Sequence, residues 1–299
     1  MTDKSTGLIF DLADHGELHT RLCAALGLPA GLLHRRRFPD GESYLRFGQD
    51  INGRDVLLLC SLDRPNEKAL ELMFAAAAAR DLGARSVGLI APYLAYMRQD
   101  KRFQPGEAVT STAFAKFLSS NVDWLVTVDP HLHRRNDLGE IYDIPTQVVH
   151  AAPEMAAWIA QNVDRPLLIG PDSESAQWVS AVADAAGAPF VVLEKHRLGD
   201  RRVEVSVPEV QRWARYTPVL VDDIISTART MIATVDHLKT TGLPTPVCLG
   251  VHAIFAGNGY DELVSAGVAR IATCNTILHS SNAIDISGQL ADAVGKLTR

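Results

Sequence analysis

The sequence has 299 residues, of which 47% are hydrophobic and 21% charged, a composition typical of an ordered globular protein rather than a disordered chain. A net charge of −6 at pH 7 without a long Lys/Arg run argues against a nucleic-acid partner, and no apolar segment is long enough to span a bilayer. The four cysteines lie far apart and the N-terminus lacks the apolar stretch of a signal peptide, so we expect free thiols and a cytoplasmic protein with no membrane partner.

Apolar runs rich in β-branched residues alternate with Ala-rich stretches of helical periodicity along the chain. Strands are expected at residues 56–60, 87–91, 124–129, 167–170, 190–193, 219–221, 247–251 and 268–273. Helices are expected at residues 67–82, 111–118, 154–162, 175–186 and 230–240. This alternation predicts an α/β protein with mainly parallel sheets flanked by helices, in two domains, 1–149 and 150–299. Ligands of such sheets bind beyond the carboxyl ends of the strands, so the segments that follow strands are the candidate sites.

The earliest candidate segment is F-P-D-G-E-S-Y at residues 38–44. Pro39, Asp40 and Gly41 form a turn signal between two extended stretches of chain. On its own, this pattern predicts a hairpin whose Asp40 and Glu42 carboxylates are solvated.

A strongly cationic loop follows the second expected strand. Arg98, Lys101 and Arg102 place three cations within five residues, an arrangement that suits a triphosphate. Gln99 can hydrogen-bond a base, and Asp100 can bind a cation or a hydroxyl group. The alternative at this point is a charged loop that is simply solvated.

Two further strand ends carry potential metal ligands. The third expected strand continues into V-D-P-H-L-H, in which His131 and His133 alternate and can share one side of an extended segment. The fourth expected strand continues into G-P-D and ends at Asp172. A lone histidine is more often hydrogen-bonded or solvated than metal-bound, so both interpretations stay open on these residues alone.

A basic arm follows the fifth expected strand. Lys195 and Arg197 alternate, so in an extended chain they face the same way, and Gly199-Asp200 turns the chain towards a return strand at 203–207. Two cations on such a flap can close over a polyphosphate. A solvent-exposed basic hairpin is the alternative.

Asp222-Asp223 follow the sixth expected strand, and after them come two isoleucines and the turn S-T-A-R-T at 226–230. Such a turn directs backbone N–H groups and three hydroxyl groups at one point, at the positive end of a helix, and this suits a phosphate. Carboxylates repel phosphate but accept hydrogen bonds from a vicinal diol or hold Mg²⁺. The combination predicts a phosphorylated sugar, whereas the simpler alternative makes Ser226 or Thr227 a helix N-cap.

Together, these segments resemble the ribose-phosphate diphosphokinase family over nearly the whole chain. The string Y-x-x-Y-x-R-Q-D-K-R-F-x-P-G-E at 93–107 is long and specific, and it is similar to that family's ATP loop. The acid pair and the hydroxyl-rich turn resemble the ribose-phosphate loop that the family shares with type I phosphoribosyltransferases. The resemblance implies two type I phosphoribosyltransferase-like domains, which convert ATP and ribose 5-phosphate to 5-phosphoribosyl 1-diphosphate and AMP.

The resemblance also implies a role for each matching residue. The ATP-binding residues would be Phe38, Asp40, Glu42, Arg98, Gln99, Asp100, Lys101 and Arg102. The ribose 5-phosphate-binding residues would be Asp222, Asp223, Ser226, Thr227, Ala228, Arg229 and Thr230. The Mg²⁺ ligands would be His131 and Asp172, and the catalytic cations would be Lys195 and Arg197. In this family the 38–42 loop reaches ATP across a subunit contact, so a homo-oligomer is expected.

A few positions depart from the family pattern. Ala228 and Arg229 stand where small residues, often a glycine pair, are usual, and Ser226 stands where Asp is frequent. A backbone position that needs a positive φ is harder to form without glycine. Glu174 also adds a negative charge close to Asp172. These departures leave a non-catalytic regulatory relative as one alternative, and a phosphoribosyltransferase, which would not need the ATP loop, as another.

Overall fold

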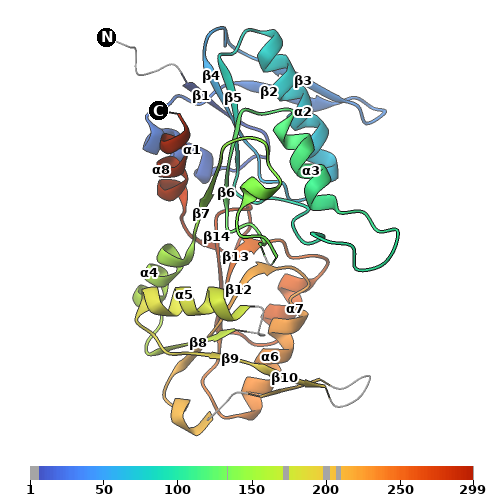
Figure 1. The fold of residues 1–299 in the computed structure, drawn as a ribbon. Coiled ribbons are helices and arrows are strands. Elements are labelled where there is room, and N and C mark those ends of the chain that lie inside the picture. Colours follow the sequence, from blue (N-terminus) through green and yellow to red (C-terminus); the bar gives the residue numbers. More distant parts are fainter. Residues whose placement is uncertain (1–6, 133, 171–174, 198–202, 207–209, 299) are drawn as a thin grey trace. The chain divides into compact units, whose positions relative to one another are not determined.

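The structure, a computed structural model, describes residues 7–132, 134–170, 175–197, 203–206 and 210–298 (Figure 1). The chain forms two compact units. The first comprises Met1–Val149, Thr276–Leu278 and Ser287–Arg299, and the second comprises His150–Asn275 and His279–Ile286. Each unit contains a parallel sheet flanked by helices, so the predicted α/β fold class is confirmed.

A five-stranded parallel sheet forms the centre of the first unit. Its strands, which lie side by side in this order, are β1 (Gly7–Asp11), β4 (Asp55–Leu59), β5 (Ser86–Ala91), β6 (Trp124–Val128) and β7 (Thr146–Val149). β6, with the sequence W-L-V-T-V, is buried along its whole length. Such continuous apolar runs are expected where helices cover both faces of a sheet.

Helices flank both faces of the first sheet (Figure 1). One face is covered by α2 (Pro65–Asp81) and α3 (Thr110–Ser119), the other by α1 (Glu17–Leu26) and α8 (Ser287–Leu297), and a 3₁₀ turn spans Leu138–Glu140. α1 ends at Gly27, where a φ of 65° allows the N–H groups of Gly27 and Leu28 to bond carbonyl groups of the last turn.

An antiparallel hairpin of β2 (Leu33–Arg37) and β3 (Ser43–Phe47) follows α1 and packs against α2. The Ser43 hydroxyl donates to Glu71 Oε1 of α2 at 3.1 Å. The connection at 38–42 turns at Gly41, whose φ is 94°. The hairpin predicted from F-P-D-G-E is therefore confirmed.

The second unit contains a six-stranded parallel sheet of order β15-β14-β13-β12-β8-β9. The strands are β8 (Pro166–Gly170), β9 (Phe190–Val192), β12 (Thr217–Ile225), β13 (Val247–Ala253), β14 (Arg270–Cys274) and β15 (Asn282–Ile284). After β8, the chain adds β9 on one side and then β12 on the other. β8 and β12 thus flank the point at which the strand order reverses, where ligands of open α/β sheets bind.

Two helix pairs flank the second sheet (Figure 1). They are α4 (Ala152–Asn162) with α5 (Ala176–Ala186), and α6 (Arg229–Thr240) with α7 (Gly259–Ser265). A 3₁₀ turn at Val210–Trp213 and an antiparallel hairpin of β10 (Glu194–Arg197) and β11 (Val203–Ser206) lie between β9 and β12 in the chain. β11 is the return strand that the sequence of the basic arm predicted.

The C-terminal helix belongs to the first unit. α8 buries Leu290, Ala291, Ala293 and Val294 and contacts α1, β6 and β7. The predicted second domain, 150–299, included this helix, and the structure differs from that division at 276–278 and 287–299. The physical reason is that the apolar face of α8 is buried on the first sheet.

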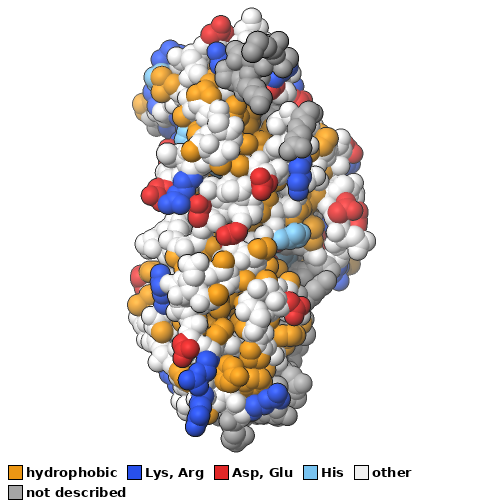
Figure 2. All heavy atoms as spheres, turned by 90° about the vertical axis from the view of Figure 1, so that its left-hand side faces the viewer, with side chains coloured by type: hydrophobic (Ala, Val, Ile, Leu, Met, Phe, Trp, Pro, Cys, Tyr) orange, Lys and Arg blue, Asp and Glu red, His pale blue; other side chains and the backbone are white. Residues whose placement is uncertain are grey.

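No helix in the described part of the chain is long and apolar enough to cross a membrane. All four cysteines are free thiols, and burial raises the pKa of Cys60 and Cys248 to about 12. On the face shown in Figure 2, Lys and Arg side chains are scattered among Asp and Glu side chains. That face therefore presents no continuous cationic surface among the described residues.

Candidate active site

The cationic loop and the histidine segment leave the same edge of the first sheet. β5 and β6 are neighbouring parallel strands, paired from Gly88 with Trp124 to Ala91 with Thr127. The loop that carries Arg98 follows β5, and the segment that carries His131 follows β6. Both predicted segments therefore lie at the sheet edge where ligands bind.

Two arginines of the segment after β6 hold the cationic loop at Asp100. Arg134 Nη1 donates to both carboxylate oxygens of Asp100, at 2.9 and 3.1 Å, and the Asp100 side chain is only 6% exposed. Arg135 Nη2 lies 3.4 Å from the Asp100 carbonyl oxygen and 3.3 Å from Thr112 Oγ1 at the start of α3. The cation that Asp100 binds is therefore Arg134, and the pair fixes the position of the loop.

The rest of the cationic loop is braced from within. Glu107 Oε2 accepts hydrogen bonds from the N–H groups of Phe103 and Gln104, at 2.7 and 3.0 Å. Arg102 Nε donates to the Glu107 carbonyl oxygen at 2.9 Å. Arg98, Lys101 and Arg102 are exposed, and Gln99 is half-buried. The loop thus has a defined backbone and presents its cations to solvent.

The tip of the β2–β3 hairpin carries the other predicted ATP residues. Arg36 stacks on Phe38 and Tyr44, with its guanidinium carbon 4.2 and 4.6 Å from the ring centres. Asp40 and Glu42 are exposed. Within the first unit, the hairpin tip and the 98–107 loop lie apart (Figure 1), so one chain does not bring these two sets together.

The predicted metal ligands are only partly described. His131 is half-buried after β6, and Asp172 lies outside the described residues. Asp129 adopts a φ of 32°, and its N–H donates to the Val149 carbonyl oxygen at 2.9 Å, which extends the pairing with β7. Within the described ranges, no group of three or more His, Cys, Asp or Glu side chains forms a metal site.

The acid pair lies inside a strand rather than after it. β12 was expected to end at 221 and runs to Ile225, so Asp222 and Asp223 are consecutive residues of its last half. Asp222 pairs in register with Gly250 of β13, and its Oδ1 accepts the N–H of Asp223 at 3.0 Å. Pairing with β13 extends the strand because the neighbouring strand continues to Ala253.

Ala228 forms the turn between β12 and α6. It is the N-cap residue of α6, with φ 56° and ψ 4°, and no side-chain hydrogen bond caps this helix. The alternative in which Ser226 or Thr227 is the N-cap is therefore wrong. Thr227, Arg229 and Thr230 are exposed at this turn. An uncapped helix N-terminus beside hydroxyl groups retains its attraction for an anion.

Lys195 and Arg197 belong to β10, which pairs with β11. Lys195 is opposite Val205, and Arg197 is opposite Val203. As alternate residues of one strand, they occupy positions on the same face of the hairpin.

An open hollow between α6 and α7 includes none of the predicted site residues. Its lining includes Asp236, Lys239, Asp261 and Glu262. Asp236 and Lys239 lie 3.3 Å apart as an ion pair. The remaining acidic side chains do not suit a phosphorylated ligand, because they repel it.

Comparisons with known proteins decide the family. Residues 8–121 match the N-terminal domain of ribose phosphate pyrophosphokinase, and residues 137–287 match the phosphoribosyl transferase domain. The ribose-phosphate pyrophosphokinase of Methanopyrus kandleri is 33% identical over 284 residues, which cover 94% of this chain and 96% of that protein. The Sulfolobus acidocaldarius protein of the same name is also 33% identical, over 85% of this chain and 87% of its own. The chain belongs to the ribose-phosphate pyrophosphokinase family.

A solved structure supports the fold of this pyrophosphokinase family member. The phosphoribosylpyrophosphate synthetase of Mycobacterium smegmatis is 23% identical, with a TM-score of 0.85, and the match covers 98% of this chain and 99% of that one. The predicted family and its ATP-dependent diphosphotransferase activity are confirmed. The residue assignments remain predictions.

Sequence reasoning missed Arg134 and Arg135 as partners of the 98–107 loop. A signal was present, because both follow the histidine motif directly at the end of β6. Their partner, Asp100, lies in the loop after β5. The sequence does not show that β5 and β6 are neighbouring strands, because this follows from the strand order of the sheet.

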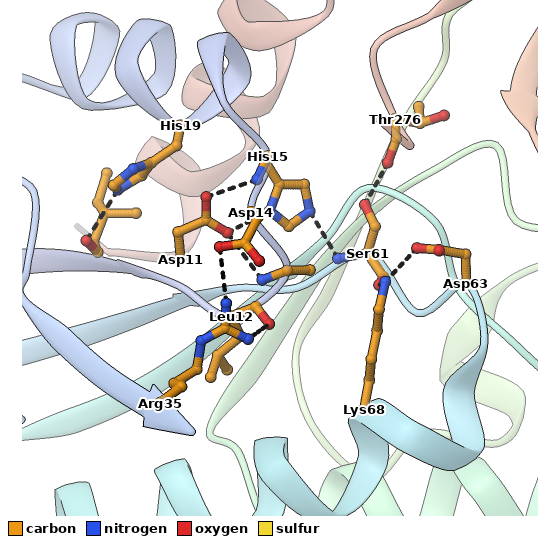
Figure 3. A network of polar contacts seen from close by, with 12 residues as sticks. Asp11, Leu12, Asp14, His15, His19, Arg35, Ser61, Asp63, Lys68 and Thr276 are labelled. Carbon is orange, nitrogen blue, oxygen red and sulfur yellow. Dashed lines mark hydrogen bonds and ion pairs between the residues drawn. The ribbon is translucent and has the colours of Figure 1, made fainter. Parts of the chain in front are cut away.

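A polar network lies at the ends of β1 and β4 and contains none of the predicted site residues (Figure 3). His15 Nδ1 donates to Asp11 Oδ1 at 2.6 Å, and His15 Nε2 accepts the N–H of Ser61 at 2.9 Å. The Ser61 hydroxyl donates to the Thr276 carbonyl oxygen, and Lys68 Nζ donates to the Ser61 carbonyl oxygen at 2.8 Å. The network therefore attaches the 276–278 segment to the first sheet.

Asp11→Asn is expected to lower the free energy of unfolding by about 2 kcal/mol at pH 7. Burial raises the pKa of Asp11, but hydrogen bonds and charge from His15 and the N–H of Ala13 outweigh it and lower the pKa from 3.8 to about 2. Since the folded pKa is depressed, this stabilisation is present above about pH 4 and is lost as the pH falls towards about 2.

Urea unfolding of wild type and Asp11→Asn at pH 7 and pH 3 measures this difference. The exposed Asp81→Asn is the matched control and should behave as wild type at both pH values. A difference between wild type and Asp11→Asn that stays constant with pH would contradict the prediction.

Gly259→Ala is expected to raise the KM for ribose 5-phosphate by about tenfold or more, because small displacements of a binding loop are costly. A Cβ at this position would lie 2.8 Å from the Ser226 carbonyl oxygen and 3.1 Å from the Thr227 carbonyl carbon. The 226–230 turn, the predicted ribose 5-phosphate site, must therefore move to admit it. Steady-state kinetics with Gly295→Ala as the control, a helical glycine with open space around it, tests this. Equal KM values for both variants would refute it.

Proposed function

We propose that this chain binds ATP at the carboxyl edge of the first sheet and ribose 5-phosphate at the β12–α6 turn, and transfers the β,γ-diphosphate between them. The observation that carries the sugar assignment is the strand order of the second sheet. The strand order reverses between β8 and β12, which is where ligands of open α/β sheets bind. β12 carries the acid pair Asp222 and Asp223 and leads into the uncapped N-terminus of α6.

At the turn, the 5-phosphate is held by the first N–H groups of α6 and by the hydroxyl groups of Ser226, Thr227 and Thr230. Arg229 adds a cation on the exposed side of the turn. Asp222 and Asp223 accept hydrogen bonds from the sugar hydroxyl groups. The positive φ of Ala228 supports this arrangement, because it reverses the chain in front of the helix.

ATP is held by the loop after β5. Arg98, Lys101 and Arg102 neutralise phosphate charge, and Gln99 hydrogen-bonds the base. The Arg134–Asp100 ion pair positions these residues before the nucleotide binds, which reduces the cost of ordering the loop.

In the transfer, the anomeric hydroxyl oxygen attacks the β-phosphorus of ATP. The new bond joins this oxygen to the β-phosphorus, the bond from the β-phosphorus to the α,β-bridging oxygen breaks, and AMP leaves with that oxygen. The hydroxyl proton passes to solvent. Lys195 and Arg197 neutralise the charge on the transferring diphosphate.

Mg²⁺ is the proposed cofactor, with His131 and Asp172 as its protein ligands. Mg²⁺ prefers oxygen ligands, which the Asp172 carboxylate would supply, and the His131 imidazole would bind the ion directly or through a water molecule. When bound, the ion offsets the charge of the polyphosphate. His131 is suitably placed for this at the carboxyl end of β6.

We infer a homo-oligomer from the separation of the two predicted ATP-binding segments. Because the hairpin tip with Phe38, Asp40 and Glu42 lies apart from the 98–107 loop of its own chain, a second copy would supply it. Leu70 and Phe74 expose 54% and 42% of their surface on α2, beside the hairpin, and offer an apolar contact. Sedimentation velocity that detects a monomer alone would contradict this.

The free thiols support a cytoplasmic enzyme.

The decisive assay supplies the purified chain with Mg²⁺, ribose 5-phosphate and ATP labelled at the β-phosphorus. The expected result is AMP and labelled 5-phosphoribosyl 1-diphosphate in equal amounts, with neither formed when the sugar is omitted. ADP and free phosphate would indicate simple ATP hydrolysis instead. Absence of AMP at every pH and phosphate concentration would favour the non-catalytic relative.

A further inference from the structure

The sugar-phosphate turn is supported by the loop that follows β13. The N–H of Phe255 donates to the Ile225 carbonyl oxygen at 2.9 Å, and the N–H of Ala256 donates to the Ser226 carbonyl oxygen at 3.1 Å. Gly259, at the start of α7, lies against the backbone of Ser226 and Thr227. Any movement of Phe255 is therefore transmitted to the turn through two backbone hydrogen bonds.

Phe255 has a strained backbone that needs support from its surroundings. Its φ is 36°, a region that residues with a Cβ rarely adopt outside functional sites. Its ring packs on the rings of His279, with centroids 4.6 Å apart, and Tyr260, with centroids 5.1 Å apart. His279 and Tyr260 also touch, at 4.8 Å between centroids. The three rings form a closed cluster behind the turn.

His279 is the member of this cluster that is fixed by hydrogen bonds. Its Nδ1 accepts the backbone N–H of Ser281 at 3.1 Å and lies 2.8 Å from Ser281 Oγ. The backbone N–H of His279 donates to Asn282 Oδ1 at 2.9 Å. Thr273 Oγ1 of β14 lies 2.8 Å from Ser281 Oγ. The ring is thus tied to the sheet, and since Nδ1 accepts a hydrogen bond, the imidazole is neutral with its proton on Nε2. Burial lowers the pKa of His279, which favours the same form.

We propose that His279 is a positioning residue for ribose 5-phosphate, which acts by holding Phe255 and, through it, the backbone of the 226–230 turn. Within the described part of the chain, its contacts are with Phe255, Tyr260, Ser281 and Asn282 and include no predicted substrate-binding residue. The proposal rests on the placement of ribose 5-phosphate at this turn. It adds a residue that no binding motif contains and that acts on the sugar rather than on ATP.

The test compares His279→Ala, which removes a ring, with His279→Phe, which retains one. Each aromatic pair contributes modestly, so the loss of two pairs predicts about a tenfold higher KM for ribose 5-phosphate in His279→Ala, with an unchanged KM for ATP. His279→Phe is expected to recover at least half of this change on a logarithmic scale. Tyr260→Leu also loses two ring pairs, but it keeps an apolar side chain and the His279–Phe255 contact, so it should raise the same KM by a smaller factor.

Circular dichroism and melting temperature establish that each variant is folded before kinetics are measured. If His279→Ala does not fold, His279→Phe and Tyr260→Leu provide the same comparison. Equal increases in both KM values, or none, would overturn the proposal. Asp223→Asn separates this outcome from failure of the sugar site. If Asp223→Asn weakens ribose 5-phosphate and His279→Ala does not, only the role of His279 is wrong. If neither does, the turn is not the sugar site.

Discussion

Lys195→Ala is expected to lower kcat by about 10²- to 10³-fold, the cost of losing one group that stabilises charge in a transition state. In the proposed mechanism the ammonium group neutralises the diphosphate as it moves between two oxygens, so its loss should affect the transition state more than bound ATP. The Kd for ATP should change by less than about threefold, since the 98–102 loop supplies separate cations. AMP release measures kcat, and calorimetry measures the Kd.

Lys195→Arg is the matched control for this prediction. It keeps the charge on β10, opposite Val205, and is expected to retain more activity than Lys195→Ala. Val205→Ala alters the opposite strand without changing charge and should leave kcat within about twofold. Unchanged turnover in Lys195→Ala would remove Lys195 from the mechanism, whereas a large loss of ATP affinity would make it a binding residue.

Asp223→Asn and Asp222→Asn are each expected to lower kcat/KM for ribose 5-phosphate by about 10- to 100-fold, in line with hydrogen bonds to a charged acceptor. Asparagine keeps the shape of the side chain but has one acceptor oxygen in place of two, and it lacks the negative charge. The KM for ATP should remain near the wild-type value. Initial-rate kinetics with each substrate varied in turn measures both quantities.

The control for the acid pair is Asp236→Asn on α6. Asp236 is exposed and pairs with Lys239, so its charge belongs to the same helix but not to the turn. Its effect on kcat/KM should be less than about twofold, because exposed ion pairs contribute little. If Asp223→Asn and Asp236→Asn were equally mild, the acid pair would have no specific role with the sugar.

Local patterns predicted the central strands and the motifs because each is encoded in adjacent residues. The apolar run at 124–129 predicted a strand, and β6 occupies it. The segment with Lys195 and Arg197 was predicted to be one arm of a hairpin, and it forms β10, which pairs with β11. The glycine-free turn raised the question of positive φ, and the structure places a φ of 56° at Ala228. A Cβ in this conformation costs roughly 1–2 kcal/mol.

Features that depend on neighbours distant in the chain were not predictable from one sequence. β12 extends through Asp222 and Asp223 because β13 continues beside it, and the sequence alone placed the strand end at 221. The Arg134–Asp100 pair depends on the adjacency of β5 and β6. His279 lies in no recognisable motif, and its contact with Phe255 spans 24 positions that the fold brings together.

The return of α8 to the first unit has a consequence for how the protein is made. The ribosome has synthesised 1–149 long before it reaches 287–299, and until then the surface of α1, β6 and β7 that α8 covers stays open. The first unit therefore completes its core only after 287–299 has been synthesised. A nascent fragment that stops at 149 should require a chaperone or aggregate, whereas addition of a 287–299 peptide should rescue its solubility.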